Sequence, residues 1–352
     1  MAEVTLAGIE KTYGATVAVR DVSLQVADGE FVTLLGPSGC GKTTTLHMVA
    51  GLIAPTRGAI TVGGRAVADA ARGLFVPPHK RNLGMVFQSY ALWPHMTLAE
   101  NVRYPLKIRR VRGAEATRRV GTALELVGLG TFAGRYPHEL SGGQQQRGAL
   151  ARALVAEPDI LLLDEPLSNL DAQLREELRG EIRRVQREVG TTVLFVTHDQ
   201  TEAMAVSDRI AVMDAGSIAQ IGTPREVYAH PATLFVATFV GAVNVLDATT
   251  EGGNTHAAAL PALALPLDAP APTTAPRFRA AVRPEDIALL PAKGAAVIGV
   301  VETRTYLGDR AAYTVRAGEL LLRVLTPNTE DAAPGATVGL AVRRAVALPP
   351  DG

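Results

Sequence analysis

The sequence has almost no cysteine and no excess of charge of either sign. Of its 352 residues one is cysteine, Cys40, and 35 basic residues balance 35 acidic ones. A single cysteine excludes an internal disulfide and suits a reducing compartment. The balanced charge argues against a protein whose main work is holding nucleic acid, because such proteins usually carry a strong basic excess.

Long apolar runs are absent as well. The N-terminus, Met1-Ala2-Glu3-Val4, has neither the basic start nor the apolar stretch of a secretory signal. No segment approaches the roughly 20 apolar residues that a membrane-spanning helix needs. The longest runs, Ile160–Leu163 and Val193–Val196, have the length of strands. We therefore expect a soluble chain, so that any membrane role must come through a partner.

Strand-like and helix-like segments alternate up to about residue 235. Continuous apolar runs predict buried strands at Phe31–Leu35, Ile160–Leu163 and Val193–Val196. Helical patterns follow them at Lys42–Leu52, Ala172–Val189 and Gln200–Ala205. This repetition predicts an α/β fold with a mostly parallel sheet that is covered on both faces.

Two segments near these strands have a different pattern. Val22, Leu24 and Val26 alternate with polar residues, which indicates an antiparallel strand with one face in water. Residues 97–157 form a more helical region between the strands.

The chain changes character after Gly241. Helical signals fade, and Ala, Pro and Thr dominate through Pro276. A β-rich tail follows, with strand-like runs at Val297–Thr303, Ala312–Arg316 and Leu320–Leu325. Short strands with frequent turns predict a small barrel or sandwich. The length also exceeds a single core, so we expect two domains, at residues 1–240 and 241–352.

A phosphate-binding loop is predicted between the first buried strand and its helix. The segment Gly36-Pro37-Ser38-Gly39-Cys40-Gly41-Lys42-Thr43 fits the pattern G-x-x-x-x-G-K-[ST]. Glycines let successive backbone N–H groups point at phosphate oxygens, and the helix N-terminus adds partial positive charge. Lys42 can reach the β- and γ-phosphates, and Thr43 offers a hydroxyl to Mg²⁺. The alternative is a chance glycine-rich turn, against which the strand before and the helix after both argue.

Two acidic residues end the second buried strand. Asp164 follows Ile160–Leu163 directly, where a carboxylate can reach the Mg²⁺ side of a phosphate loop. Glu165 is the next residue and could polarise an attacking water. Two solvated acids at a strand end would be the ordinary interpretation, and the phosphate loop upstream favours the functional one.

A third segment identifies the class. Leu140-Ser141-Gly142-Gly143-Gln144-Gln145-Gln146-Arg147 resembles the signature motif of ABC ATPases. It offers a serine hydroxyl and two unhindered glycine amides at the start of a helix expected to run to about Ala156, which is again an anion site. A serine-glycine turn that only caps the helix is the alternative.

The other landmarks of the ABC ATPases appear in the family's order. Gln88 resembles the Q-loop glutamine, and Ser168-Asn169-Leu170-Asp171 resembles the D-loop. His198 resembles the switch histidine that contacts the γ-phosphate, and Tyr13 resembles the aromatic residue that stacks on adenine. Each alone has an ordinary structural interpretation, but their order along the chain supports the resemblance.

The resemblance implies a fold and a mechanism. The fold is a P-loop NTPase cassette of the α/β class, with a mixed sheet core and a helical subdomain, followed by a small β-rich, OB-like domain. Two copies would meet head to tail, with ATP between the P-loop of one and the signature of the other, so that ATP binding closes the homodimer and hydrolysis releases it.

The resemblance also implies roles for individual residues. Glu165 would be the general base, with Gln88, His198 and Lys42 completing the catalytic set. Mg²⁺ would be held by Thr43, Gln88 and Asp164. The nucleotide would contact Tyr13, Gly36, Pro37, Ser38, Gly39, Cys40, Gly41, Lys42, Thr43, Thr44, Ser141, Gly142, Gly143 and Gln144.

The tail indicates a branch of the family. Arg283-Pro284-Glu285-Asp286 and Tyr306-Leu307-Gly308-Asp309 resemble the TOBE domain of importer ATPases of the maltose, polyamine and ferric-iron groups. The resemblance implies integral membrane permease subunits as partners, a periplasmic or extracellular solute-binding protein, and no nucleic acid. It also implies a peripheral location on the cytoplasmic face of a bacterial plasma membrane. The segment 76–97 favours ferric iron or a polyamine as the cargo.

Several alternatives stay open at this point. The chain could be a non-transport ABC ATPase that handles DNA or ribosomes, or an exporter ATPase, or its tail could be only a structural cap. Trp93 and Pro94 could line a groove for the permease, or Trp93 could be core. Gly148 stands where the family usually has a bulky apolar residue, which puts the rigidity of its helix in doubt. A solvated helical face, or a surface for anionic lipids, could be formed by Arg103, Arg109, Arg110, Arg112, Arg118 and Arg119.

Overall fold

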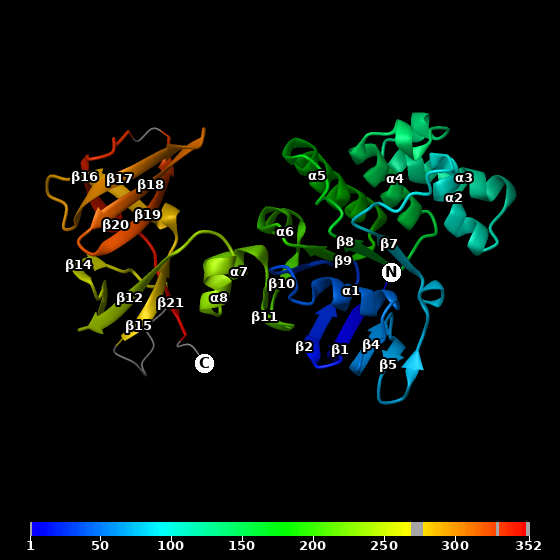
Figure 1. Ribbon diagram of the computed structural model, residues 1–352, viewed down its shortest axis with the longest axis horizontal. Coiled ribbons are helices and arrows are strands. Elements are labelled where there is room, and N and C mark those ends of the chain that lie inside the picture. Colours follow the sequence, from blue (N-terminus) through cyan, green and yellow to red (C-terminus); the bar gives the residue numbers. More distant parts are fainter. Residues whose placement is uncertain (1, 269–276, 329–330, 350–352) are drawn as a thin grey trace. The chain divides into compact units, whose positions relative to one another are not determined.

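The computed structural model describes residues 2–268, 277–328 and 331–349, which fall into two compact units (Figure 1). The units are Met1–Pro224 and Arg225–Gly352. The expected division at residue 240 differs from this one by two short helices, α7 (Pro224–Ala229) and α8 (Leu234–Phe239). Helix α8 belongs with the second unit because Ala237 packs against Ala281 and Leu348.

A six-stranded sheet forms the centre of the first unit. Its strand order is β11-β10-β3-β9-β8-β7, and all neighbours are parallel except the pair of β10 and β11. The strands are β3 (Phe31–Leu35), β7 (Leu83–Val86), β8 (Ile160–Asp164), β9 (Thr192–Thr197), β10 (Arg209–Asp214) and β11 (Ser217–Gly222). The three predicted buried strands are therefore confirmed, and they lie next to one another as β3, β9 and β8.

Both faces of this sheet are covered, as the apolar runs predict. Leu161 and Leu163 pack into one hydrophobic cluster, whereas Ile160 and Leu162 pack into another. The split follows from the alternation of side chains along a strand. Buried parallel strands of this kind read as continuous apolar sequence because neither face meets water.

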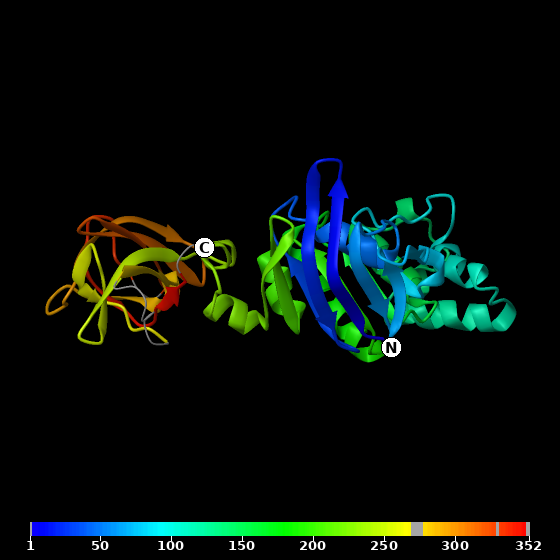
Figure 2. The ribbon, with the colours of Figure 1, turned by 90° about the horizontal axis from the view of Figure 1, so that it is seen from below.

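An antiparallel sheet of order β2-β1-β4-β5-β6 covers one face together with α1 (Lys42–Ala50). Its strands are β1 (Val4–Tyr13), β2 (Thr16–Val26), β4 (Arg57–Val62), β5 (Arg65–Asp69) and β6 (Leu74–Phe75). In β2, Val22, Leu24 and Val26 are buried whereas Ser23 and Gln25 are exposed, so the predicted wet face is confirmed. Strands β1 and β2 form a long hairpin (Figure 2).

Helices cover the other face. Figure 1 shows α2, α3 and α4 gathered beside β7 and β8, with α5 next to them. The helices of this unit after α1 are α2 (Leu98–Ile108), α3 (Gly113–Leu126), α4 (Gly142–Leu154), α5 (Ala172–Val189) and α6 (Gln200–Val206). A Cβ at Gly148 of α4 would lie 2.6 Å from Cδ1 of Leu98 in α2. The glycine therefore has a packing reason, since it lets the two helices approach closely.

The arginines of α2, α3 and the segment between them mostly contact the protein itself. Arg118 and Arg119 both pair with Glu115, one turn earlier on α3. Arg109 donates to the carbonyl of Ala156 at 2.7 Å. These contacts favour a solvated helical face over a surface for anionic lipids.

The second unit contains two five-stranded antiparallel sheets, of orders β14-β13-β12-β15-β21 and β16-β20-β17-β18-β19. Residues of both sheets, among them Leu246, Val282, Tyr313 and Leu322, form one hydrophobic cluster. The strands are β12 (Asn244–Glu251), β13 (Asn254–Ala257), β14 (Leu260–Ala264), β15 (Arg277–Val282), β16 (Ile287–Pro291), β17 (Ile298–Tyr306), β18 (Arg310–Ala317), β19 (Leu320–Pro327), β20 (Thr337–Val342) and β21 (Val346–Leu348).

No strand was predicted in the Ala- and Pro-rich segment after Gly241, but its first part contains three. Strands β12, β13 and β14 occupy residues 244–264, while residues 269–276 lie outside the described residues. Alanine has a low strand propensity, but Ala248 and Ala257 are small residues on the buried face of the sheet. Across the described residues, no helix has the length and apolar content needed to cross a membrane.

Candidate functional site

The site is built at one edge of the central sheet. Parallel pairing places the last residues of β3, β9 and β8 side by side, with Leu35 opposite Thr197 and Asp164 opposite Val196. The phosphate loop, His198 and Glu165 follow directly at these strand ends. Ligands of open α/β sheets bind at the carboxyl ends of the strands, so the topology brings the predicted residues to the expected edge.

The phosphate loop depends on close backbone contacts that only glycine permits. Gly41 has φ +100°, and a Cβ there would lie 2.5 Å from the carbonyl oxygen of Ala18. A Cβ at Gly36 would lie 2.4 Å from the carbonyl oxygen of Met213. Helix α1 begins immediately afterwards at Lys42, so its N-terminal amides face the loop.

Lys42 folds back onto its own loop. Its Nζ donates to the carbonyl oxygens of Gly36 and Pro37, both at 2.8 Å, and lies 3.8 Å from Sγ of Cys40. The ammonium group is almost fully buried. A triphosphate in the loop would offer Nζ charged acceptors in place of these carbonyls, and charge-assisted hydrogen bonds are the stronger ones.

Cys40 lies inside the loop and is buried. Burial raises the pKa of its thiol above the ordinary value of 9.0, although the nearby Lys42 ammonium acts in the opposite direction. The thiol is therefore largely protonated at neutral pH.

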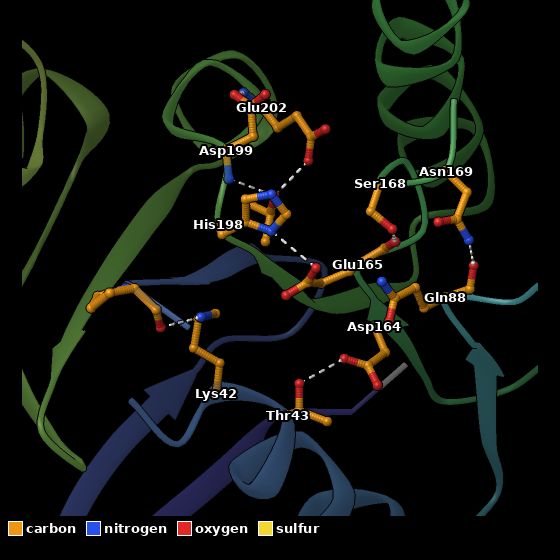
Figure 3. Close-up of polar contacts among 12 residues, drawn as sticks. Lys42, Thr43, Gln88, Asp164, Glu165, Ser168, Asn169, His198, Asp199 and Glu202 are labelled. Atoms are coloured by element: carbon orange, nitrogen blue, oxygen red, sulfur yellow. Dashed lines mark hydrogen bonds and ion pairs between the residues drawn. The ribbon is translucent and has the colours of Figure 1, made fainter. Parts of the chain in front are cut away.

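Thr43 and Asp164 are joined directly. The Thr43 hydroxyl donates to Oδ1 of Asp164 at 3.1 Å (Figure 3). The side chain of Gln88 points toward the turn of Asp164 and Glu165 in the same view. A hydroxyl, a carboxylate and an amide carbonyl are all oxygen donors of the kind that Mg²⁺ prefers, so the three residues fit this metal.

Sequence reasoning missed a residue here. Nε2 of His47 lies 3.3 Å from Oδ2 of Asp164, the oxygen that Thr43 does not use. The approach lacks hydrogen-bond geometry, because this nitrogen has no hydrogen-bond partner among the described residues. Thr43 and His47 are separated by four residues on α1 and so share a helix face. That spacing could have identified His47.

Glu165 and His198 form the second contact of the site. Nδ1 of His198 lies 2.9 Å from Oε2 of Glu165 (Figure 3). Glu165 has φ +42°, a left-handed conformation that is unusual for a residue with a side chain. Such strain clusters at functional sites. The turn aims the carboxylate of Glu165 toward the histidine and away from the strand.

The D-loop contacts the Q-loop. Nδ2 of Asn169 donates to the backbone oxygen of Gln88 at 2.9 Å. The Ser168 hydroxyl donates to the backbone oxygen of Glu165 at 3.0 Å. The two segments that the sequence assigned by resemblance are therefore joined to each other and to the turn at Glu165.

The signature segment forms a complete capping box. The Ser141 hydroxyl accepts from the Gln144 N–H at 3.3 Å, and Oε1 of Gln144 accepts from the Ser141 N–H at 2.9 Å. A Cβ at Gly143 would lie 2.8 Å from Cδ1 of Leu174. The Ser141–Gln144 turn therefore caps the start of α4. No hydrogen bond or ion pair joins Ser141–Gln144 to the phosphate loop within the described part of one chain.

Tyr13 lies apart from these contacts. It ends β1 at the tip of the hairpin and is 50% exposed. Nζ of Lys11 lies 5.1 Å from the centre of its ring. The ring is therefore open for stacking.

Trp93 lines a surface cavity of about 360 Å³ together with Phe87, Tyr104 and Ile108. Its ring centre lies 4.4 Å from that of Tyr104. Trp93 is half-buried and Ile108 is 60% exposed, so this is an open apolar groove and not a part of the core.

Comparison with known proteins agrees with the site. The ABC transporter family matches residues 19–168, and the TOBE domain family matches residues 280–348. A dimeric structure of the ABC transporter cassette MJ0796 is 35% identical, with a TM-score of 0.55, and the match covers 63% of this chain and 99% of that one. The fold and site thus define an ATP-binding cassette that hydrolyses ATP.

The relatives identify the branch. FbpC 1 of Rhizobium meliloti, a Fe(3+) ions import ATP-binding protein, is 47% identical over 98% of this chain and 97% of its own length. The spermidine/putrescine import ATP-binding protein PotA of Acidothermus cellulolyticus is 48% identical over 94% and 89%. MalK of Thermococcus litoralis, a trehalose/maltose import ATP-binding protein, is 55% identical over 72% and 69%. The chain belongs to the ABC import ATP-binding proteins that carry a TOBE domain.

Proposed function

We propose that two copies of the chain form an ATP-driven motor in which each ATP is held by the phosphate loop of one copy and by Ser141–Gln144 of the other. The observation that carries this proposal is the joining of Thr43 to Asp164 and of Glu165 to His198 at one sheet edge. Among the described residues of one chain, no hydrogen bond or ion pair joins the signature turn to this edge. A related cassette is described as dimeric in a post-hydrolysis state with ADP and Pi.

The catalytic roles follow from the chemistry of the groups. Glu165 would accept a proton from the attacking water, and His198 would hold its carboxylate in position through the 2.9 Å contact. Lys42 would leave the carbonyls of Gly36 and Pro37 and neutralise phosphate charge. Backbone amides at the start of α1 would bind the phosphate oxygens.

Thr43, Gln88 and Asp164 would hold Mg²⁺. When bound there, the ion would neutralise charge on the β- and γ-phosphate oxygens. The hydrogen bond of Thr43 to Asp164 and the direction of the Gln88 side chain in Figure 3 support this assignment.

We propose that a cytoplasmic segment of the membrane permease binds in the groove around Trp93. Its apolar lining and the exposure of Ile108 support a protein partner. The chain would then lie peripherally on the cytoplasmic face of a bacterial plasma membrane, and an external solute-binding protein would deliver the cargo. Affinity purification of the tagged chain from solubilised membranes should yield one or two multi-span proteins and no nucleic acid.

The cargo is proposed to be ferric iron or a polyamine. The relatives named above are import proteins for iron, spermidine/putrescine and trehalose/maltose, so their names alone do not select among these solutes. Uptake of labelled Fe³⁺, spermidine and maltose by vesicles that contain the purified complex would decide. Uptake of labelled maltose, with no uptake of Fe³⁺ or spermidine, would contradict the assignment.

The central test is Glu165→Gln. It should keep ATP binding, reduce hydrolysis by about 10²–10⁴-fold, and convert the protein to a stable dimer when MgATP is added. Light scattering coupled to size exclusion measures the dimer. Glu176→Gln, at an exposed position of α5, is the matched control and should behave as the unchanged protein. A Glu165→Gln protein that stays monomeric and hydrolyses ATP at the normal rate would refute the proposal.

A further inference from the structure

Helix α4 makes functional contacts at both of its ends. Its N-terminus is the capping box of Ser141 and Gln144, and its last turn carries Arg152. These ends are separated by about 16 Å at 1.5 Å per residue. If the helix moves as one element, a displacement at one end reaches the other.

Arg152 forms hydrogen bonds with the loop that follows Gln88. Its guanidinium donates to the backbone oxygen of Ala91 at 2.6 Å and to that of Tyr90 at 2.9 Å. Both residues have left-handed backbones, with φ +60° for Tyr90 and +51° for Ala91. Two successive residues of this kind are held only when the surroundings determine them strongly.

Arg152 has no acidic partner among the residues that the structure describes, and it is 8% exposed. Burial lowers the pKa of its guanidinium accordingly. If the helix moves, either the loop moves with it or a charged group and two carbonyls lose their hydrogen bonds.

The rest of the loop is fixed as firmly. Arg152 lies over the ring of Trp93, 5.0 Å from its centre. The fully buried Asn101 of α2 accepts from the Trp93 N–H and donates to the oxygens of Trp93, Met96 and Thr97. The loop of residues 89–97 is therefore bonded to both α4 and α2, and its Trp93 lines the groove.

We propose that Arg152 is a positioning residue that makes the loop of residues 89–97 follow α4 when ATP binds at Ser141–Gln144. This inference rests on the proposed function, which places the start of α4 against the nucleotide of the other copy. The signature end would then sense ATP, and the Arg152 end would move Gln88 and the Trp93 groove together. If Arg152 only stabilised the loop, the conformation of residues 89–97 would not change when ATP binds.

The chain contains its own reporter, because Trp93 is its only tryptophan. In a Glu165→Gln background, saturating MgATP should change the acrylamide quenching and the emission maximum of Trp93. In Arg152→Lys in the same background the change should be lost, while the affinity for ATP stays the same. Lysine keeps the charge but cannot bind both carbonyls with a planar fork. Arg103→Lys is the matched control and should keep the change, because Arg103 is a half-buried arginine of α2 that donates to the Thr117 hydroxyl and not to the loop.

The outcomes separate the inference from the proposed function. If MgATP does not bind or does not dimerise the background protein, the proposed function fails. If MgATP binds and dimerises the background protein, two results refute the role of Arg152. One is that Trp93 fluorescence does not change in the background protein, and the other is that it changes equally in Arg152→Lys.

A measurement on the unchanged protein covers the case in which Arg152→Lys does not fold. Hydrogen exchange of peptides that span residues 88–97 and 141–154 should change together when a non-hydrolysable ATP analogue is added. A change confined to residues 141–154 would overturn the inference.

Discussion

Glu165 donates its backbone N–H to the carbonyl oxygen of Val196, 3.0 Å away on the neighbouring strand. This bond holds Glu165 in its left-handed conformation, with φ +42°. A side chain in this region costs roughly 1–2 kcal/mol, whereas glycine has no such cost. The carboxylate that we assign as general base is therefore placed at the expense of local backbone strain.

This strain predicts a difference between two inactive variants. Glu165→Gly should unfold at a higher denaturant concentration than Glu165→Ala, with a free energy of unfolding about 1 kcal/mol larger. Both variants lack the carboxylate and should hydrolyse ATP poorly. Urea denaturation followed by circular dichroism measures the difference. Equal midpoints, or a less stable glycine variant, would show that the conformation at this position carries no strain.

Ser141 caps α4 and is also proposed to contact the second copy's ATP, and separate substitutions can distinguish the two roles. Ser141→Ala removes the cap on α4 and should lower stability by about 1 kcal/mol. Ser141→Arg adds a bulky cation where the second copy's ATP is proposed to lie, and it should abolish turnover while a single subunit still binds nucleotide. Steady-state hydrolysis and fluorescent-nucleotide binding check the two results. Normal hydrolysis by Ser141→Arg would rule out the shared site.

Cys40 permits a chemical test of the phosphate loop. Because burial raises the pKa of its thiol, alkylation should be slow at pH 7.5 and should accelerate as the pH is raised through and above 9. Bound MgATP should slow the reaction further by covering the loop. AMP at the same concentration lacks the β- and γ-phosphates and should protect little. The chain has no other cysteine, so mass spectrometry of the intact protein follows this site alone. Equal rates with and without MgATP would contradict the placement of the phosphates.

Glu202 should make stability depend on pH. Burial raises the pKa of its carboxyl above the ordinary value of 4.5, and Asp199 acts in the same direction, against the Thr197 hydroxyl, Arg175 and His198. The folded state then holds a proton that the unfolded chain has lost, so this residue lowers stability as the pH rises above about 4.5. Glu202→Gln imitates the protonated form. It should be more stable than the unchanged protein at pH 7.5, with a smaller difference at pH 4.5. Thermal unfolding at the two pH values measures this, and a difference that is constant with pH would contradict it.

Local signals in the sequence were sufficient for much of the fold. Helix α5 was predicted at its observed bounds, because Asp171 caps its start and Gly190, with φ +74°, ends it. The motif residues at the strand ends were found from the phosphate-loop pattern, the acidic strand end and the family resemblance, and the structure brings them to one edge because their strands are parallel neighbours. The strands β12–β14 were missed, since their sequence is rich in alanine, which has a low strand propensity.

The contacts that the sequence could not predict are long-range and polar. Nothing in the sequence around Arg152 or Arg81 indicates what their guanidinium groups bind, and only the tertiary structure places backbone carbonyls around them. His47 was detectable from its helical spacing to Thr43. Its contact with Asp164 could not be predicted, because it depends on where β8 lies relative to α1. Periodicity indicates which face of an element is buried. The partners of these side chains depend instead on which element packs against that face.

Arg81 should be the clearest stability determinant of the first unit. It is buried and donates to four backbone oxygens, those of Val76, Met48, Val49 and Val67, at 2.7–3.1 Å. Met48 and Val49 belong to the last turn of α1, where a cation also interacts favourably with the helix dipole. Burial lowers the pKa of Arg81 to about 10, so it remains charged at neutral pH.

Replacement of Arg81 should therefore destabilise the fold without touching the nucleotide. Arg81→Met keeps an apolar stem but leaves buried carbonyls without donors, and it should cost about 3 kcal/mol or more. Arg81→Lys should recover only part of this, because one ammonium group cannot span four oxygens on three segments. Arg57→Met, at an exposed position 3.8 Å from Glu10, is the control and should cost close to nothing. Urea midpoints measure all three, and an Arg81→Met protein as stable as Arg57→Met would show that the four bonds contribute little net stability.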